Sequence, residues 1–313
     1  MSRRLIPEFK SYVKTLIVSI LSLGSYVGVA QNNAQYTQYM FNGLIINPAY
    51  AGMDEALSLT IANRMQWTGV DGAPVTQTFS GHTLFKNKHM GTGLSLVNDK
   101  IGVHNNFSAM GSYAYHISFN KSVRLSFGFQ AGIHNNKSDY SSLAASSGND
   151  PLVGTSGLSQ TSFDVGAGIY FRTSRLHIGL SAPQILSENS VVNDTMTVHW
   201  RRINYLLFSK YRVHLNNVID LEPCVLVKYF PGNPISFDLN MNIVAFDAVT
   251  LGLSYRKDES VDFLFRGKIT QQIQFGYAYD YPIGDVPKAG NGSHEIVINY
   301  RFKFVYDKVV SPR

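Results

Sequence analysis

Residues 123–134 read Val-Arg-Leu-Ser-Phe-Gly-Phe-Gln-Ala-Gly-Ile-His, and this stretch decides the fold. Every second residue is apolar, and the residues between them are polar, charged or glycine. Successive side chains of a β-strand point to opposite faces of the sheet, so the alternation predicts a strand with one apolar and one polar face. The apolar face holds Val123, Leu125, Phe127, Phe129, Ala131 and Ile133.

The same alternation recurs along the chain, separated by turn-like breaks such as Pro231-Gly232-Asn233. Clear copies occupy 163–172, 235–244 and 296–304. Weaker copies occupy 56–64, 75–85, 90–98, 107–119, 175–181, 201–211, 218–229, 248–257, 260–269 and 272–281. The pattern therefore predicts fourteen strands, an even number that suits a barrel with both ends of its chain on one side. Counts of twelve or sixteen also fit this spacing.

Alternating strands can form a soluble sandwich, with apolar faces packed inward, or a membrane barrel, with apolar faces turned to lipid. Charged residues make up only 15% of the chain, well below the ~25% of soluble domains. Strands of about ten residues match a tilted crossing of the bilayer. Aromatic residues such as Tyr277, Tyr279 and Tyr281 gather near strand ends, as in interfacial girdles. We predict an all-β, transmembrane antiparallel β-barrel of about 14 strands.

Residues 1–30 have the composition of a secretion signal. Arg3, Arg4, Lys10 and Lys14 precede the apolar stretch 15–27, and the small residue Ala30 suits a signal peptidase. We predict cleavage between Ala30 and Gln31, with an uncleaved anchor as the alternative. Residue 31 is not cysteine, which argues against a lipoprotein. The mature chain, with 23 basic and 20 acidic residues, has no basic block for nucleic acid. The predicted location is integral in the cell outer membrane.

Residues 31–54 lack the alternation, and the barrel is expected to occupy 55–313. This N-terminal segment combines Gln and Asn with an apolar patch at 41–46. Its backbone cannot face lipid with unpaired polar groups, so it must lie in the lumen or at the periplasmic mouth. Pro48 disfavours the α region at Asn47 and predicts a fixed turn there. Two alternatives follow: residues 35–53 plug the lumen, or the segment is an extension that caps the first strand.

The connection between the first two strands, residues 64–76, holds Arg64, Gln66, Trp67, Gly69, Gly72 and Pro74. A Trp with Arg and Gln beside it is typical of a protein-binding hot spot. The same residues suit an interfacial anchor followed by a tight turn. With a periplasmic N-terminus, this connection and the long stretch 135–160 would both be extracellular.

No pattern indicates catalysis or a bound metal. The nine histidines are scattered singly, with no HExxH, CxxC or GxSxG spacing, and the single Cys224 can form no internal disulfide. We therefore expect no enzyme activity and no cofactor. Several charges fall on predicted lumen faces and are expected to pair across the barrel, because an unpaired buried charge is costly. They include Asp164, Arg172, Asp238, Arg256, Asp280 and Arg301.

Several motifs together resemble one family. They are Asn47-Pro48-Ala49-Tyr50-Ala51-Gly52, Arg64-Met65-Gln66-Trp67-Thr68-Gly69 with Gly72-Ala73-Pro74-Val75-Thr76, Asp99-Lys100-Ile101-Gly102, Gly179-Leu180-Ser181-Ala182-Pro183, Lys228-Tyr229 and Gly292-Ser293-His294-Glu295-Ile296. In this order they resemble the PorP/SprF family of type IX secretion system membrane proteins, over essentially the whole mature chain. The resemblance implies a Bacteroidetes outer-membrane barrel that serves protein secretion and, in some members, gliding motility. It makes Asn47, Pro48, Tyr50, Gly52 and the 64–76 motif candidate contacts or structural elements.

Two functions follow from these observations. The first is an adaptor that binds periplasmic ring or lipoprotein components, the translocon or a cargo adhesin of the type IX system. The second is a porin or FadL-like passive transporter of small or hydrophobic solutes. The strand faces also predict that Arg at Phe127 or Leu239, facing lipid, costs about 2–4 kcal/mol, and that Arg at Gly128 or Asn240 is tolerated better.

Overall fold

The computed structural model describes residues 34–139, 158–186, 203–284 and 290–302, together with the backbone of 188–192 and 196–200. The predicted leader and its cleavage point between Ala30 and Gln31 lie outside the described residues, as does most of the predicted loop 135–160.

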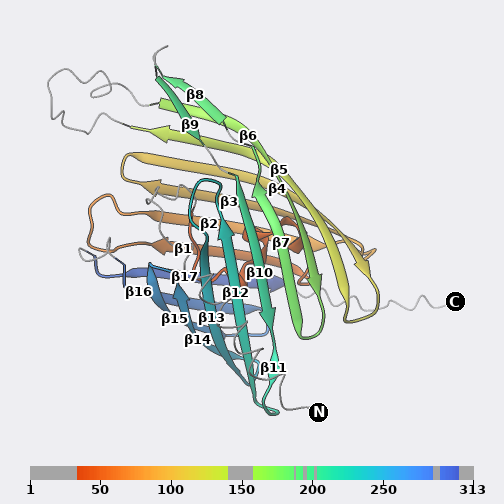
Figure 1. Cartoon of the computed structure of the whole chain (residues 1–313). Helices are drawn as coiled ribbons and strands as arrows, with labels where there is room; N and C mark the ends of the chain where they lie inside the picture. Colours follow the sequence, from red (N-terminus) through yellow and green to blue (C-terminus); the bar gives the residue numbers. More distant parts are fainter. Residues whose placement is uncertain are drawn as a thin grey trace, which may run out of the picture.

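Fourteen antiparallel strands close into a barrel (Figure 1). They are β1 (Leu57–Met65), β2 (Val75–Leu84), β3 (Met90–Ile101), β4 (His104–Ser118), β5 (Arg124–Ser138), β6 (Leu158–Arg172), β7 (Leu176–Gln184), β10 (Asn204–Tyr211), β12 (Ile219–Tyr229), β13 (Ser236–Ala245), β14 (Val249–Arg256), β15 (Ser260–Lys268), β16 (Ile273–Pro282) and β17 (Ser293–Phe302). Each pairs with its sequence neighbours, β1 pairs with β17, and β7 pairs with β10, which in turn pairs with β12. The short β11 (Val213–His214) follows β10 and also pairs with β12. The predicted fold and strand count are confirmed.

A separate hairpin, β8 (Glu188–Val192) with β9 (Met196–Trp200), was not expected from the pattern. β5 and β6 are also longer than predicted, by residues 135–138 and 158–162. In this part of β5 the outward residues Asn135 and Lys137 are polar, and so are the inward ones. Beyond the bilayer both faces of a strand meet polar surroundings, so the alternation that marks a membrane strand disappears there.

The outer surface is apolar and the lumen is polar. On β13, Leu239, Met241 and Ile243 are 46%, 48% and 46% exposed, whereas Asn240 and Asn242 between them are 4% and 0% exposed. Phe127 and Phe129 of β5 are outward in the same way. A soluble fold would bury its apolar face and expose its polar face. The exposed apolar band is therefore the lipid-facing surface of an outer-membrane barrel. Among the described residues, no helix is long and apolar enough to cross a membrane.

The two ends of the barrel differ. One end has short connections, at 85–89, 119–123, 173–175, 246–248 and 269–272. The other has longer connections at 66–74, 230–235 and 283–292, beside two short ones at 102–103 and 257–259. We call these the turn end and the loop end. Short turns face the periplasm in outer-membrane barrels, which places the turn end there. β1 begins and β17 finishes at this end.

Residues 34–56, which we call the lumen segment, lie inside the barrel. The segment contains three short helices, η1 (Tyr39–Phe41), α2 (Gly43–Ile46) and η2 (Pro48–Tyr50). It starts at the loop end, where Gln35 contacts Glu259, and reaches the turn end, where Asp54 pairs with Arg301. The lumen segment therefore runs the length of the barrel before β1 begins. The sequence allowed two positions for this segment, the lumen and the periplasmic mouth. The contacts with Glu259 and Arg301 at opposite ends of the barrel are those expected in the lumen.

Leu239→Arg should destabilise the barrel by about 2–4 kcal/mol, because it places a charge in hydrocarbon near the middle of the lipid-facing band. Urea unfolding of the protein in phospholipid vesicles measures this change in free energy. Phe246→Arg is the matched control, since Phe246 is 74% exposed in the turn between β13 and β14 and should cost about 0–1 kcal/mol. Equal costs at both positions would contradict the assignment of the lipid-facing band.

Candidate functional site

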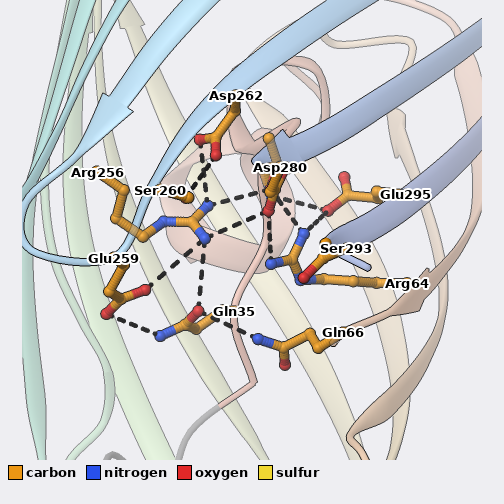
Figure 2. Close-up of polar contacts among 12 residues, drawn as sticks. Gln35, Arg64, Gln66, Arg256, Glu259, Ser260, Asp262, Asp280, Ser293 and Glu295 are labelled. Carbon is orange, nitrogen blue, oxygen red and sulfur yellow. Dashed lines mark hydrogen bonds and ion pairs between the residues drawn. The ribbon is translucent and has the colours of Figure 1, made fainter. Parts of the chain in front are cut away.

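The lumen segment is fixed at the loop end by buried charges (Figure 2). Arg64 of β1 is 2% exposed and lies with Nη2 2.7 Å from Asp280 Oδ2 and Nη1 3.5 Å from Glu295 Oε2. The same Nη1 donates to Thr37 Oγ1 at 2.7 Å, and Thr37 Oγ1 donates in turn to Asp280 at 2.8 Å. Glu295 accepts the backbone N–H groups of Thr37 and Gln38 at 2.7 and 3.0 Å. Thr37 and Gln38 of the segment are thus hydrogen-bonded to buried charged side chains of the barrel wall.

A second guanidinium completes this network. Arg256 of β14 lies on the other side of Asp280 from Arg64, as Figure 2 shows. It lies 3.5–3.8 Å from four carboxylates, those of Asp238, Glu259, Asp262 and Asp280. Arg256 Nη2 also donates to Thr37 Oγ1 at 3.0 Å. Buried charges are stable only when they are paired and hydrogen-bonded. Thr37 Oγ1 supplies part of this hydrogen bonding, because it accepts from both guanidinium groups and donates to Asp280.

The predicted lumen charges do pair, but not across the barrel: Arg256 pairs with Asp238 of the adjacent strand and with Asp280 of β16, and Arg301 pairs with Asp54 of the lumen segment. Asp164 pairs with His134 instead of a predicted charge, and Arg172 with Glu55. Sequence reasoning missed Arg64 and Glu295 as members, although both fall on the inward side of their strands. The alternation of apolar and polar residues along β1 and β17 already indicated that both side chains point into the lumen.

The middle of the lumen segment fits glycine positions of the wall. A Cβ at Gly128 of β5 would lie 2.1 Å from Ala49 N, and one at Gly168 of β6 would lie 2.2 Å from Asn47 Oδ1. On another wall, a Cβ at Gly276 of β16 would lie 2.2 Å from Gln38 Oε1. The glycines therefore leave the space that the segment fills, and an arginine at Gly128 would have to displace the Ala49 backbone.

The Asn47–Gly52 motif forms the turn that the segment needs. Asn47 is extended at φ −152° and ψ 117°, as Pro48 requires, and its Oδ1 accepts the Ala49 N–H at 2.9 Å. Its Nδ2 donates to the carbonyls of Ile169 and Leu180 at 3.0 and 3.3 Å. Asn47 thus caps its own turn and ties it to β6 and β7.

The second half of the motif holds the segment at the turn end. Tyr50 packs edge-on against Tyr170 and His82, with ring centroids 5.4 and 5.6 Å apart, and donates its hydroxyl to Asp54 at 3.2 Å. Gly52 has φ +83°, where a side chain is strained, and donates its N–H to His82 Nδ1 at 3.1 Å. The motif residues are therefore structural contacts within the lumen.

The 64–76 connection divides between the lumen and the surface. Gln66 Nε2 donates to Gln35 Oε1 at 3.4 Å, and its backbone N–H donates to the Pro74 carbonyl at 2.9 Å. Trp67 is half-buried, has φ +45° and donates its N–H to Ser293 Oγ at 3.2 Å. Gly69 and Gly72, at φ +92° and +73°, are exposed and make the turn. Arg64 and Gln66 thus face the lumen segment, which leaves the exposed glycines and part of Trp67 at the surface.

Cavities remain beside the lumen segment, and two of them are large enough to hold a ligand. The first, about 160 Å³, lies toward the loop end and is lined by Tyr36, Tyr39, Ile45, Ile46, Met110, Leu206, Leu226 and polar residues that include Gln130 and His134. The second, about 290 Å³, lies at the turn end, and we call it the turn-end vestibule. Within the described part of the chain, no group of three His, Cys, Asp or Glu side chains is placed to hold a metal ion.

A substitution at Gly128 tests how tightly the lumen segment is held. Gly128→Val should displace the Ala49 backbone and make the segment accessible to chymotrypsin at Tyr39 and Phe41, at a cost of about 1–3 kcal/mol. Cleavage is followed by mass spectrometry in detergent. Gly111→Val is the control, because a Cβ there has only the Ala131 carbonyl nearby, at 3.7 Å. Equal protection in both variants would count against the fit described above.

The closed apolar-faced barrel with a chain segment through its lumen defines the class of the protein, an outer-membrane β-barrel with an occupied lumen. The chain belongs to the family of the type IX secretion system membrane protein PorP/SprF, whose family model matches residues 28–300. The family predicted from the motifs is therefore confirmed.

Comparison with solved structures found membrane channels and outer-membrane proteins of low sequence identity. The CymD monoaromatic hydrocarbon channel is 12% identical, with 88% of this chain and 95% of that chain covered at a TM-score of 0.50. A Pseudomonas aeruginosa FadL homologue is 11% identical (82% and 93% covered, TM-score 0.46), and Omp33 of Acinetobacter baumannii is 9% identical (79% and 99% covered, TM-score 0.45). At 12% identity the likeness to CymD concerns the barrel fold alone. Comparison with curated proteins gave no match.

Proposed function

We propose that this barrel is a partner-binding adaptor of the type IX secretion apparatus, which works by contact with other proteins and not by passage through its lumen. Its partners would be periplasmic ring or lipoprotein components, the translocon or a cargo adhesin. The observation that carries the proposal is the lumen segment, because it crosses the barrel from end to end. A pore would need this space, whereas an adaptor can use it to stiffen the barrel.

The way the segment is held supports the same function. At the loop end Thr37 is tied into the buried charges of Arg64, Arg256, Asp280 and Glu295. At the turn end the Met53 carbonyl accepts from Arg172 at 2.8 Å, and the Ala51 carbonyl accepts from His116 Nε2 at 2.9 Å. A segment fixed at both ends is costly to displace, which disfavours a gate that must open for each solute.

Passage of hydrophobic solutes is the second candidate, and the cavity of about 160 Å³ favours it. Its lining mixes Tyr36, Tyr39, Ile45 and Leu206 with a few polar groups, which is the composition of a small-molecule site. CymD, which shares the fold, is a channel for monoaromatic hydrocarbons. In this alternative the barrel would bind a small apolar solute beside η1 and α2.

Export and maturation belong to the same proposal. We expect the mature chain to begin at Gln31, after cleavage behind Ala30, and N-terminal sequencing of the protein from outer membranes tests this. We also propose that the barrel has no enzyme activity and needs no cofactor, since binding alone accounts for the role.

Co-purification tests the adaptor function. A tag placed after Arg313 allows the barrel to be recovered from native envelopes in mild detergent, and quantitative mass spectrometry identifies what accompanies it. Stoichiometric recovery of type IX periplasmic components, translocon subunits or an exported adhesin is the expected result. Recovery of the barrel alone, together with saturable binding of a monoaromatic hydrocarbon to the purified protein, would favour the second candidate.

A further inference from the structure

The turn-end vestibule is strongly cationic. Among the described residues, its walls carry seven Lys or Arg side chains and three carboxylates, those of Asp54, Glu222 and Asp247. Six of the cations, Arg172, Arg175, Lys210, Arg212, Lys268 and Arg301, come from β6, β10, β15, β17 and the connections beside them. A hollow lined by one sign of charge between low-dielectric walls concentrates ions of the opposite sign.

The carboxylates at the vestibule are already engaged. Glu222 Oε1 lies 2.6 Å from Arg212 Nε, and Asp54 Oδ2 lies 3.2 Å from Arg301 Nη2 and 3.6 Å from His82 Nε2. Asp247 is 73% exposed, so solvent screens its charge. The three acids therefore do not neutralise the cations that remain.

Several cationic groups lack an acid in the part of the chain that the structure describes. Arg175 and Lys268 are exposed, and no described carboxylate lies within 4.0 Å of either. Arg266 stacks over the Phe41 ring at 4.0 Å from its centroid and donates to Gln274, also without a described ion-pair partner. The Nε of Arg301 is a buried donor with no acceptor among the described residues. The vestibule thus presents cationic hydrogen-bond donors that have no anionic acceptor among the described residues.

The opposite mouth has the opposite balance. At the loop end five carboxylates, those of Asp238, Glu259, Asp262, Asp280 and Glu295, surround Arg64, Arg256 and Lys228. An anion would therefore be drawn to the turn end and repelled from the loop end, so the charge selects one mouth of the barrel.

We propose that the turn-end vestibule binds an acidic peptide segment of a periplasmic partner protein. The inference rests on the adaptor function and on the turn end facing the periplasm. The cations are spread around the mouth, from the β6–β7 connection to β15 and β17, and do not converge on one point. Several carboxylates spaced along an extended chain match that spread better than one compact anion does. The vestibule, about 290 Å³, has room for a few side chains.

Fluorescence anisotropy with a fluorescein-labelled hexaglutamate peptide tests the proposal on the full-length barrel in detergent. We expect saturable binding that weakens as salt rises from 50 to about 500 mM, since screening acts on exposed charges. The double variant Arg175→Glu/Lys268→Glu should weaken binding by about tenfold or more. The control Lys88→Glu/Lys121→Glu makes the same charge change in exposed turns at the same end, outside the vestibule, and should bind as the wild type does.

Three results would overturn the proposal. They are no binding of hexaglutamate, equal weakening in both double variants, or complete competition by pyrophosphate at a concentration of phosphate groups equal to that of the peptide carboxylates. The last result would mean a site for a compact phosphate anion. Failure here leaves the adaptor function standing if partners still co-purify with the Arg175→Glu/Lys268→Glu barrel. Loss of co-purification from the wild-type barrel would instead remove the adaptor function.

Discussion

Deletion of residues 34–53 is expected to convert a barrel of low conductance into an open channel. The intact segment crosses the lumen and touches both the β5–β6 wall, through Ala49 and Asn47, and the β16 wall, through Gln38. A fourteen-stranded barrel without it would have a lumen between the filled interior of an eight-stranded barrel and the aqueous channel of a porin. Planar-bilayer recordings of the two proteins should show steady openings only for the deletion variant.

The deletion also removes partners of Arg64, Arg256 and Glu295, so its folding must be checked by heat-modifiable migration on gels. Gly128→Val provides a second route to the same state, because it displaces the segment and leaves these charges in place. A synthetic peptide of residues 34–53 should reduce the conductance of the deletion variant. An intact barrel that conducts as strongly as the deletion variant would contradict an occupied lumen.

Arg64→Met is expected to destabilise the barrel by about 3–5 kcal/mol, because it leaves buried acids without their cation. Asp280 keeps Arg256 at 3.5 Å, but Arg64 is the cation paired with Glu295 among the described residues. The variant should also loosen Thr37, which loses the 2.7 Å hydrogen bond from Arg64 Nη1. Urea unfolding in phospholipid vesicles gives the free energy.

A second substitution separates lost pairing from lost packing. Glu295→Gln in the Arg64→Met background removes the uncompensated charge and keeps an acceptor for the Thr37 N–H, so part of the stability should return. Arg175→Met is the control, since Arg175 is exposed without a described ion pair and should change stability by less than about 0.5 kcal/mol. If Glu295→Gln further destabilised the Arg64→Met protein, the charge argument would be wrong.

The fold could be predicted because the bilayer imposes different polarity on the two faces of each strand. Phe127 beside Gly128, or Leu239 beside Asn240, marks a strand wherever lipid lies on one side and the lumen on the other. β8 has no such contrast, β9 repeats it over only the five residues Met196–Trp200, and the ends of β5 and β6 lose it beyond the bilayer. The alternation therefore predicts all fourteen barrel strands but not the hairpin.

The candidate site was less accessible from sequence. The bond between Thr37 and Asp280 joins residues 243 positions apart, and no local pattern announces it. Arg64 stood within a Trp-containing motif that also suits a surface; the alternation of β1 puts it on the inward face, but only the register of β1 with β17 sets it opposite Glu295. The direction of the lumen segment was also unexpected, since residues 34–36 lie at the loop end and not where β1 begins.

A lock between the lumen segment and the wall tests most directly whether the barrel works by contact or by passage. Asn42 and Ser80 are suitable, because Ser80 Oγ donates to Asn42 Oδ1 at 2.9 Å. The variant Asn42→Cys/Ser80→Cys, made with Cys224→Ser, would join segment and wall by a disulfide verified by mass spectrometry. Cells carrying only this variant are then compared for surface display of type IX cargo, with and without dithiothreitol. We predict unchanged display with the disulfide intact; loss of display that dithiothreitol restores would contradict the adaptor function and show that the lumen must open.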